Sequence, residues 1–357
     1  MIHPVTAERI TRHGFADRPA RSVAAAARLT TAIQAQDQLQ ARLGIRARAA
    51  DLTEADVVAA IADRTVVRTW VMRATIHLVD SADVRWLTRL LGPSFAARFR
   101  KRWLDIGLTP DVLGRTADAL PAVLSDGPRT RAEIVAGLAE RGVDIPTVAD
   151  QASFHVLLHA TGAGLICRGA EHGRTPTFAL LDDWLPDAPA GPSGDEALAE
   201  LARRYFAAFA PATAADFTTW SALASARAME LIRDELEPVD VQGRPGFRLR
   251  GDDVTPAESG TVRLVAGYDN YLVGYRDRSL LVAEQHRPAV FVGGVIKPTV
   301  LLDGRIVAVW RLARTTRDAS VTVTPLEALT ARTRSAIERE ARDIGRFIGQ
   351  PVRCRVE

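Results

Sequence analysis

Two glutamines, Gln34 and Gln36, flank Ala35 and are the side chains whose type and spacing most suggest chemistry in this sequence. An amide does not ionise near neutral pH, so the pair cannot serve as an ordinary general acid and base. Two positioned amides can instead hold a water molecule and stabilise developing positive charge. The surrounding segment has a helix-like pattern, and such pairs are common on solvated helices. The pair therefore gains meaning only from the elements around it.

Histidines and cysteines offer weaker candidates for a site. His155 and His159 lie one helical turn apart, a spacing that can bind a metal, but no Glu-x-x-His context accompanies them. The two cysteines, Cys167 and Cys354, form no Cys-x-x-Cys motif and suggest neither a zinc site nor a disulfide framework. We expect no metal and no cofactor.

Arginine dominates the basic side chains. Of 46 basic residues only Lys101 and Lys297 are lysines, so 44 are arginines. GC-rich coding is enough to explain this bias, yet the planar guanidinium pairs well with phosphates and guanine edges whatever its origin. The densest basic run precedes Trp103 and is either a solvated helix face or a phosphate-binding surface; it consists of Arg98, Arg100, Lys101 and Arg102.

The length, composition and charge of the chain are those of a globular protein with more than one hydrophobic core. The chain has 357 residues, 47% hydrophobic and 25% charged, with a formal charge of +3. A chain of this length favours two or three modules. The N-terminus lacks the apolar core of a signal peptide, and no apolar run is long enough for a membrane helix. We expect a cytoplasmic protein.

One short pattern, Thr-x-Ala-acid-apolar, begins at Thr53, Thr130 and Thr213. Each threonine can cap a helix while the acid reaches back, as in a capping box. Helix and hairpin patterns follow each copy, which is the winged-helix plan. The expected helices are 57–63, 133–141, 147–160, 216–221 and 225–236, and the expected strands are 66–72, 75–79, 164–167, 177–180, 239–241 and 246–249.

The fold class is therefore predicted as α+β. Three tandem winged-helix modules are expected over residues 1–108, 109–190 and 191–255, with a Pro- and Gly-rich break at 186–194. A β-rich C-terminal unit covers 256–357, with turns at Gly293-Gly294 and Asp303-Gly304. Its expected strands are 262–265, 280–282, 289–291, 299–302, 306–311 and 320–324, and a closing amphipathic helix is expected over 327–348 with Leu329, Ile337, Ile344 and Phe347 on its apolar side.

Four motifs in the same order as in a known family give the Gln pair a setting. They lie at residues 34–37, 68–79, 205–220 and 269–278. Together they resemble the winged-helix HTH_42 family of DNA glycosylases and cover nearly the whole chain. The resemblance implies tandem winged helices in a C-shape around DNA. Ala74 stands where this family usually has glycine, which puts only the tightness of that turn in question.

The family divides by its tripeptide into Gln-apolar-Gln and Gln-apolar-Asp branches, and Gln34-Ala35-Gln36 is similar to the first, AlkZ-like type. That branch is implied to excise bulky N7-alkylguanine adducts, often as self-resistance to DNA-alkylating antibiotics, and some members unhook interstrand crosslinks. Gln34 and Gln36 would be the catalytic residues. An N7-alkylguanine is already cationic and leaves without a general acid, so the sugar, which becomes oxocarbenium-like, is the species to stabilise.

The resemblance also implies DNA contacts. The expected partner is double-stranded DNA containing alkylated purines, bound by a monomer near the nucleoid and not at a membrane. For the cluster at 269–278, an ion-paired turn is the equal alternative. The predicted DNA-binding residues are Arg68, Arg73, His77, Arg98, Lys101, Arg102, Asp269, Tyr271, Arg276 and Arg278.

Two classes of function compete on the sequence. The first is a monofunctional glycosylase, since no lysine lies near the Gln pair to form a Schiff base. The second is a winged-helix regulator without chemistry, which would usually dimerise and read DNA with one helix per protomer. Three modules in one chain fit a lesion-binding enzyme better.

Overall fold

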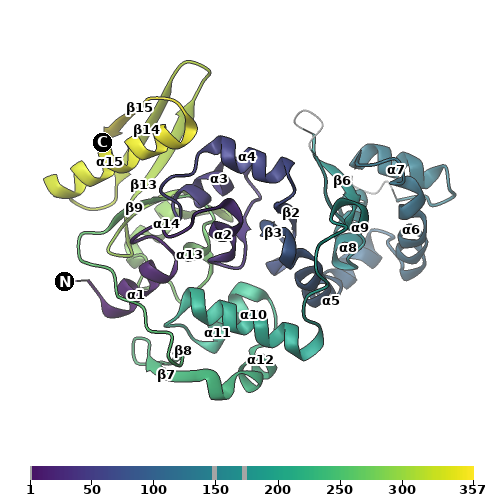
Figure 1. Ribbon diagram of the computed structural model, residues 1–357, viewed down its shortest axis with the longest axis horizontal. Helices are drawn as coiled ribbons and strands as arrows, with labels where there is room; N and C mark the ends of the chain where they lie inside the picture. Colours follow the sequence, from purple (N-terminus) through teal and green to yellow (C-terminus); the bar gives the residue numbers. More distant parts are fainter. Residues whose placement is uncertain (1, 147–150, 171–174) are drawn as a thin grey trace. The chain divides into compact units, whose positions relative to one another are not determined.

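The computed structural model describes residues 2–146, 151–170 and 175–357. The chain forms two compact units (Figure 1). Unit 1 comprises Met1–Ala60 and Ala199–Glu357, and unit 2 comprises Ile61–Leu198. The chain leaves unit 1 within helix α4 (Glu54–Ala62) and re-enters it within α10 (Gly194–Phe209). The change of unit thus falls inside the first predicted module, and the predicted module boundaries remain predictions.

All three predicted helix caps are present. Thr130 and Thr213 form capping boxes with Glu133 and Asp216, at the start of α7 (Arg131–Ala139) and α11 (Ala214–Ser221). At α4, the Thr53 N–H donates to the Asp56 carboxylate at 2.7 Å and the Asp56 N–H donates to the Thr53 hydroxyl at 3.3 Å. Each reciprocal pair satisfies donors that a helix start leaves open, so the local pattern correctly placed these three helices.

Unit 1 contains the N-terminal helices and the C-terminal sheet. The helices that precede unit 2 are α1 (Pro4–Arg12), α2 (Val23–Arg28) and α3 (Gln38–Arg46), with the short strand β1 (Ile33–Gln34) between the last two. After α10 and α11 come α12 (Ser225–Leu231), a 3-10 turn (Arg233–Glu235) and the antiparallel pair β7 (Leu236–Asp240) and β8 (Pro245–Leu249). From α11 onward, the order helix, helix, hairpin is the one predicted for the third module.

A five-stranded sheet is the largest element of the C-terminal part of unit 1, with its strands in the order β15-β14-β13-β12-β9. Its antiparallel strands are β9 (Val262–Val265), β12 (Thr299–Leu302), β13 (Arg305–Arg314) and β14 (Ala319–Pro325), and β15 (Val352–Val356) adds in parallel to β14. Helix α15 (Ala331–Ile348) buries Ile337, Ile344 and Phe347 against this sheet. The β-rich unit was therefore predicted correctly. Its closing helix was too, except at its start: it begins at Ala331 rather than 327, so Leu329 lies before it.

Several details of this unit were predicted wrongly. Residues 280–282 form turns rather than a strand, and 289–291 mostly belong to the short helix α14 (Arg287–Val290). A second short helix, α13 (Asn270–Val273), and a 3-10 turn (Glu284–His286) also lie here. The Gly293-Gly294 turn does join a small hairpin, β10 (Phe291–Val292) and β11 (Val295–Ile296). Short apolar runs do not separate buried turns from strands, because both bury their side chains.

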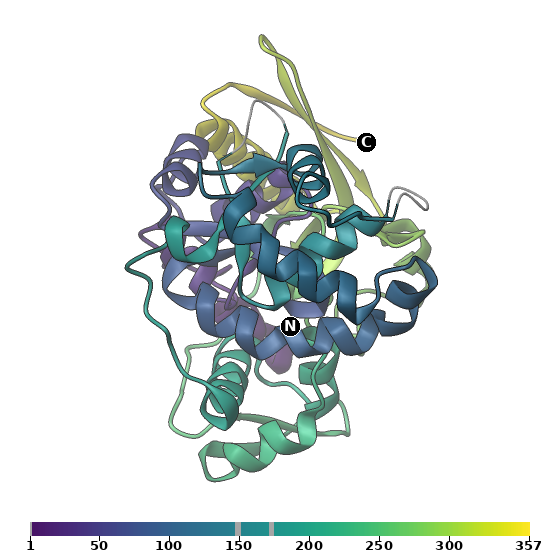
Figure 2. The same ribbon diagram turned by 90° about the vertical axis from the view of Figure 1, so that its right-hand side faces the viewer.

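Unit 2 begins with the predicted hairpin, β2 (Val66–Trp70) and β3 (Ile76–Asp80), joined by a 3-10 turn (Met72–Ala74). Helix α5 (Ser81–Asp105) follows and is the long helix crossing the view in Figure 2. The remaining elements are α6 (Pro110–Val123), β4 (Arg129–Thr130), α7, α8 (Ala152–Gly162), β5 (Ile166–Arg168), β6 (Thr177–Leu180) and α9 (Leu181–Trp184). The first part of the helix predicted at 147–160 lies outside the described residues.

Two glycines let α5 and α8 cross at close range. A Cβ on Gly92 would stand 1.8 Å from the carbonyl oxygen of Gly162, and a Cβ on Gly162 would stand 3.1 Å from the Gly92 Cα. Only residues without a side chain permit this backbone approach. In the described part of the chain, no helix combines the length and apolar character needed to cross a membrane.

Candidate active site and nucleic-acid contacts

The Gln pair does not lie in the helix that its pattern suggested: Gln34 is in strand β1 and Gln36 is in the bend that follows it. Gln34 ends β1, and Asp37 caps α3 by accepting a hydrogen bond from the Gln40 N–H at 3.1 Å, so the helix begins only at Gln38. Exposure alternates along the segment: Ala35 is fully buried, Gln34 is half-buried and Gln36 is exposed. Both glutamines therefore keep accessible surface, one on each side of a buried alanine.

A residue that the sequence did not single out holds the segment before the Gln pair. The Asn270 side-chain amide donates to the carbonyl oxygens of Thr30, at 3.3 Å, and of Ala32. Asn270 is the first residue of α13 and is buried. Its position inside the 269–278 motif was the only signal in the sequence, and nothing there indicated the partner carbonyls. One side chain thus fixes the backbone that leads into Gln34.

Asp269 anchors the same turn from inside the protein. Its carboxylate accepts two hydrogen bonds from Arg48, at 2.7 and 2.8 Å, and one from the Tyr271 N–H at 2.9 Å. The side chains of Asp269 and Arg48 are completely buried. A bidentate pair of this kind orients both groups strongly. The ion-paired turn, one of the two alternatives for this cluster, is what the structure contains.

Tyr271 also lies in the interior. Its hydroxyl donates to the Gly304 carbonyl at 3.0 Å, and its ring packs edge-on against His13 and Phe15. Burial raises the pKa of the Tyr271 hydroxyl, so this group stays a neutral donor. We therefore do not retain Asp269 and Tyr271 as DNA contacts, because neither side chain reaches the surface of the described structure.

His77 in β3 is another predicted DNA contact that the structure buries. Its Nδ1 lies 2.9 Å from the Thr75 carbonyl oxygen and donates to it in the neutral ring. Burial, reinforced by the charge of Arg73 and opposed by the bond to Thr75, lowers the pKa of His77 to about 3. A neutral, buried imidazole cannot pair with phosphate as a cation. His77 is therefore also dropped from the DNA contacts.

The turn of the β2–β3 hairpin has unusual backbone. Arg73 and Ala74 have φ angles of 58° and 56°. Glycine adopts this left-handed region without cost, whereas other residues do not. The family's usual glycine at position 74 thus has a direct physical reason, and Ala74 carries the strain in its place.

The remaining basic candidates of unit 2 are available at its surface. Arg98, Lys101 and Arg102 are exposed on α5. Arg98 donates to the Arg73 carbonyl at 3.1 Å, which ties the helix to the hairpin turn. Lys101 pairs with Asp105 at 3.0 Å, and Arg102 donates to the Gln151 amide oxygen. Exposed pairs of this kind are weak and exchange readily for phosphate. Arg68 and Arg73 are half-buried.

In unit 1, Arg276 and Arg278 follow the buried turn. Arg276 has an exposed side chain, and its backbone N–H donates to Asp216 at 2.7 Å. The Arg278 guanidinium lies 4.6 Å from the centre of the Phe291 ring. Burial and the neighbouring charge of Arg287 lower the pKa of Arg278. Both remain candidates for phosphate contact.

Other features of the sequence have structural roles. The Gln40 amide oxygen accepts a hydrogen bond from the Gly267 N–H at 2.7 Å. His155 and His159 pack against the Trp103 ring, with ring centres 6.5 and 5.4 Å away. Among the described residues, no group of three or more metal-binding side chains is found. The Gln40 amide therefore has a structural role in unit 1, and the two imidazoles have one in unit 2.

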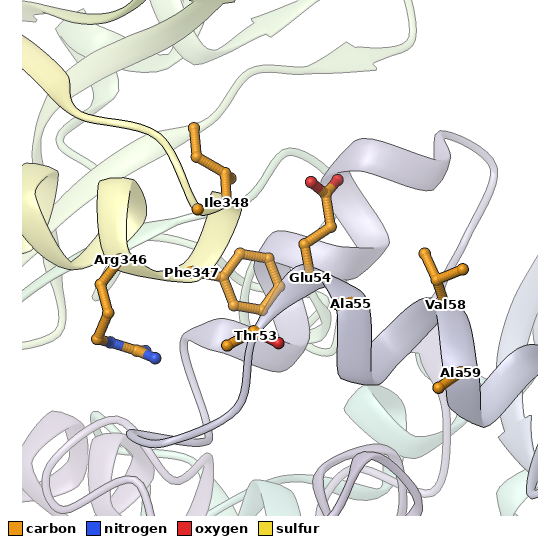
Figure 3. Close-up of a pocket in the computed structure, with 9 residues that line it drawn as sticks. Thr53, Glu54, Ala55, Val58, Ala59, Arg346, Phe347 and Ile348 are labelled. Atoms are coloured by element: carbon orange, nitrogen blue, oxygen red, sulfur yellow. The ribbon is translucent and has the colours of Figure 1, made fainter.

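An open groove of about 650 Å³ lies between α4 and the end of α15 (Figure 3). Apolar side chains, among them Val58, Phe347 and Ile348, make up most of its wall, and Figure 3 shows Glu54 and Arg346 beside them. None of the predicted site residues lines it. The groove is therefore distinct from the Gln segment.

Comparison with known proteins identifies the family. The family model described as DNA glycosylase AlkZ-like matches residues 27–347. The chain belongs to this AlkZ-like DNA glycosylase family. The match spans both units and includes the Gln pair. Family membership makes the protein a DNA glycosylase and sets aside the regulator without chemistry.

Individual relatives agree with this assignment. The interstrand DNA cross-link repair glycosylase of Streptomyces sahachiroi is 29% identical over 332 residues, covering 89% of this chain and 88% of that protein. The solved structure of the Streptomyces sahachiroi DNA glycosylase AlkZ is similar with a TM-score of 0.87 at 28% identity, covering 99% of this chain and 98% of the other. The predicted α+β class of this AlkZ-like glycosylase is confirmed.

Proposed function

We propose that this glycosylase hydrolyses the N-glycosidic bond of bulky, cationic N7-alkylguanine nucleotides in double-stranded DNA. The observation that carries the proposal is the pair of neutral amides, the half-buried Gln34 and the exposed Gln36, on either side of the buried Ala35. No ionisable side chain stands between them. The site is suited to a lesion that already carries positive charge, because such a base leaves without protonation.

Each glutamine has a distinct role in this mechanism. The Gln36 amide oxygen accepts a hydrogen bond from the attacking water and orients it, while the Gln34 amide positions the water or the sugar and phosphate. Once the water has added to the sugar, its proton passes to solvent. Both oxygen dipoles stabilise positive charge that grows on the sugar as the bond to the base stretches. Neutral adducts, which need protonation to leave, are expected to be poor substrates. No lyase step is expected after hydrolysis.

We assign DNA binding to the cationic side chains. The buried Asp269, Tyr271 and His77, which the sequence had also suggested, are not included. Guanidinium and ammonium groups neutralise phosphates and give salt-dependent, sequence-independent affinity. The glycosylase would bind its DNA as a monomer. The proposed contacts are Arg68, Arg73, Arg98, Lys101, Arg102, Arg276 and Arg278.

Alkaline cleavage of N7-methylguanine DNA tests the proposal. The wild-type enzyme should generate abasic sites, and Gln36→Ala should slow single-turnover hydrolysis by about 100-fold or more while changing the Kd for DNA only slightly. Gln38→Ala, which removes an amide from the adjacent helix α3, is the matched control and should retain activity. An equal loss of rate and affinity in Gln36→Ala would reduce Gln36 to a contact residue. Absence of abasic sites on every N7-alkyl substrate would refute the enzyme's proposed specificity.

We further propose that interstrand crosslinks joined through guanine N7 are substrates, and that the enzyme protects a producer of a DNA-alkylating antibiotic. The relative from Streptomyces sahachiroi, named as a cross-link repair glycosylase, supports the first point. Unhooking would separate crosslinked strands on a denaturing gel. Cells that express the enzyme should survive a bifunctional N7-alkylator better than cells expressing Gln36→Ala, and equal survival would argue against self-resistance.

A further inference from the structure

Unit 2 contains a cavity that no predicted function uses. It has a volume of about 400 Å³ and lies where the β2–β3 hairpin, the start of α7, α8 and the β5–β6 hairpin meet. This volume is within the range of small-molecule sites. None of the residues predicted for catalysis or DNA binding lines it. The cavity therefore needs its own explanation.

Aromatic rings form the apolar part of the cavity. Trp70 and Phe178 stack with ring centres 5.8 Å apart and planes 7° apart. Phe154 meets Trp70 edge-on at 5.6 Å and is half-buried, so part of its ring is open to the cavity. Aromatic walls of this kind favour a planar ring, which gains contact area and quadrupole complementarity without losing internal freedom.

Cations supply the polar part. The Arg168 guanidinium carbon lies 5.0 Å from the centre of the Trp70 ring and 4.7 Å from that of Phe178. Such contacts restrict the orientation of the guanidinium, and a restricted guanidinium loses less entropy on binding an anion. Arg131, at the start of α7, is exposed and also lines the cavity.

The described residues that line the cavity include no carboxylate. Glu133, the nearest acid along α7, is engaged by the backbone N–H and the hydroxyl of Thr130, both at 2.7 Å. Two arginines beside an aromatic wall are complementary to a planar ring that carries an anion.

We propose that this cavity binds a single nucleotide taken out of base stacking. Its base would lie on the half-buried Phe154, beside the buried Trp70 and Phe178, and its phosphate would pair with Arg168 and Arg131. A free mononucleotide and an extrahelical nucleotide of a DNA strand offer the same ring and phosphate. The proposal goes beyond the glycosylase reaction and does not depend on the Gln pair.

Fluorescence of 2-aminopurine, which falls on stacking, gives a direct test. The probes are 2-aminopurine deoxynucleoside 5′-monophosphate, the same nucleoside without phosphate, and a duplex with one extrahelical 2-aminopurine. Quenching should saturate with the monophosphate. The affinity for the nucleoside should be at least about tenfold lower, because the contacts of the phosphate with the arginines are lost. Stronger binding of the duplex than of the monophosphate would identify a DNA strand as the source of the ligand.

Two variants and one control locate the binding. Phe154→Leu and Arg168→Gln should each lower the affinity for the monophosphate about tenfold, the first through lost stacking and the second through lost charge. Arg115→Gln removes an exposed arginine on α6 of the same unit and should leave binding unchanged. If Arg168→Gln fails to fold, Phe154→Leu and the comparison of nucleotide with nucleoside still test whether the cavity binds the nucleotide.

The proposal is overturned if none of the probes is quenched at millimolar concentration, or if both folded variants quench like the wild type. The first result would show a solvent-filled gap, and the second would place binding elsewhere. Quenching requires no turnover and can be measured with Gln36→Ala. The cavity proposal and the glycosylase proposal can therefore fail independently.

Discussion

At the scale of single residues, the chemistry of the Gln pair is limited by what an amide can do. Gln34 and Gln36 can accept and donate hydrogen bonds but cannot take up or release a proton near neutral pH. The two buried histidines nearest in sequence do not alter this. Burial, with the charges of Arg48 and Arg9, lowers the pKa of His13 well below its ordinary value, and the pKa of His77 is about 3. Both rings are therefore harder to protonate than an exposed histidine, and His77 is neutral at neutral pH.

The first prediction concerns pH. Because no catalytic group titrates there, single-turnover hydrolysis of an N7-methylguanine duplex should be constant between about pH 5 and 8. The pKa of about 3 for His77 has the same consequence, since this ring is already neutral at pH 5 and does not change its charge as the pH rises further. Rates measured at constant ionic strength check this. A bell-shaped profile with limbs inside that range would show that an ionisable group takes part.

The second prediction exchanges one amide for a carboxylate. Gln36→Asp would bring a stronger base and a full negative charge to the developing cation, so activity on less labile adducts should increase. Its rate should fall below about pH 4, where the carboxylate becomes protonated. A pH profile of the variant beside that of the wild type provides the measurement. An inactive variant at neutral pH with intact DNA binding would contradict the assigned role of Gln36.

At the scale of elements, short contacts decide whether the site exists. The segment before Gln34 depends on Asn270 of α13, which lies 238 residues away from Ala32 in sequence. The crossing of α5 and α8 depends on Gly92 and Gly162 in the same way. In each case one backbone segment is positioned by a partner that local sequence does not specify.

Asn270 is a positioning residue, which gives the third prediction. Asn270→Ala should lower the rate of hydrolysis about tenfold or more with little change in DNA affinity, because two carbonyl groups lose their donor. The isosteric Asn270→Asp should be as damaging near neutral pH, since a carboxylate has no proton to donate. A purely packing role would leave Asn270→Asp mild, and single-turnover rates with binding curves distinguish the two.

The fourth prediction concerns the helix crossing. Gly92→Ala should destabilise unit 2 by about 1–3 kcal/mol, because its Cβ meets a backbone carbonyl that cannot rotate away. Gly114→Ala on α6, where a Cβ meets nothing within 4 Å, is the matched control and should stabilise by about 0.5–1 kcal/mol. Urea unfolding of both variants gives the comparison. Equal behaviour of the two would mean that α5 and α8 do not cross at this distance.

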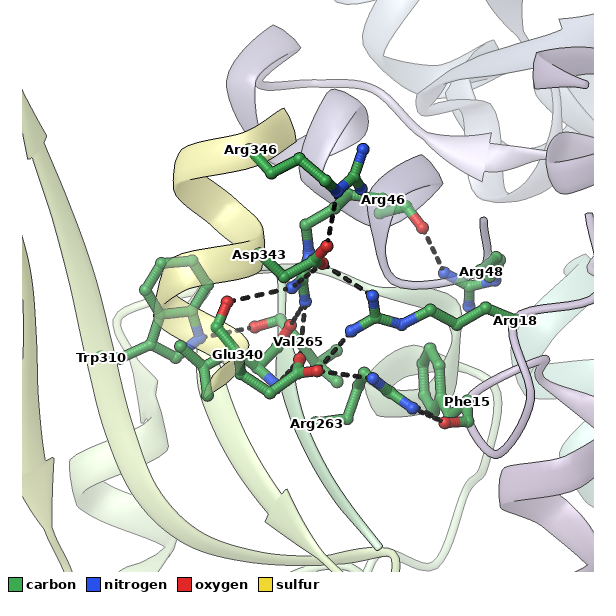
Figure 4. Close-up of polar contacts among 12 residues, drawn as sticks. Phe15, Arg18, Arg46, Arg48, Arg263, Val265, Trp310, Glu340, Asp343 and Arg346 are labelled. Atoms are coloured by element: carbon green, nitrogen blue, oxygen red, sulfur yellow. Dashed lines mark hydrogen bonds and ion pairs between the residues drawn. The ribbon is translucent and has the colours of Figure 1, made fainter. Parts of the chain in front are cut away.

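At the scale of the whole molecule, two carboxylates of α15 connect the N-terminal and C-terminal parts of the chain within unit 1. Glu340 of α15 binds Arg46 of α3 at 3.0 Å, Arg263 of β9 at 2.5 Å, and Arg18 (Figure 4). Asp343, one turn further along α15, binds Arg18 and Arg46 at 2.7 and 3.0 Å. N-terminal helices and the C-terminal sheet thus share one buried network.

This network gives the fifth prediction. Burial alone would raise the pKa of Glu340, but the charges of Arg46, Arg263 and Arg18 outweigh it and lower the pKa from 4.5 to about 2. A lowered pKa stabilises the folded state above about pH 4.5, and this contribution of about 3 kcal/mol is lost as the pH falls toward 2. Glu340→Gln should lower the free energy of unfolding by about 3–5 kcal/mol at neutral pH.

The same variant should also lose less stability than the wild type between pH 4.5 and 2, because it lacks the titrating group. Urea unfolding at several pH values measures both effects. Asp318→Asn, which removes an exposed carboxylate paired with Arg353 at 3.3 Å, serves as control and should behave like the wild type. A parallel pH dependence of Glu340→Gln and wild type would exclude Glu340 as the group responsible.

Much of this protein follows from short-range patterns in its sequence. The capping threonines at 53, 130 and 213, the β2–β3 hairpin and helix α15 were all predicted, because caps, turns and periodicity act over a few neighbouring residues. The Gln pair and the glycosylase family were also identified from the sequence. Only the tertiary structure decided that Gln34 and Gln36 lie outside a helix and that Asn270 holds the segment before them. It also decided that Asp269, Tyr271 and His77 are buried. Those features depend on contacts between residues far apart in the chain, and burial is a property of such contacts rather than of any local pattern.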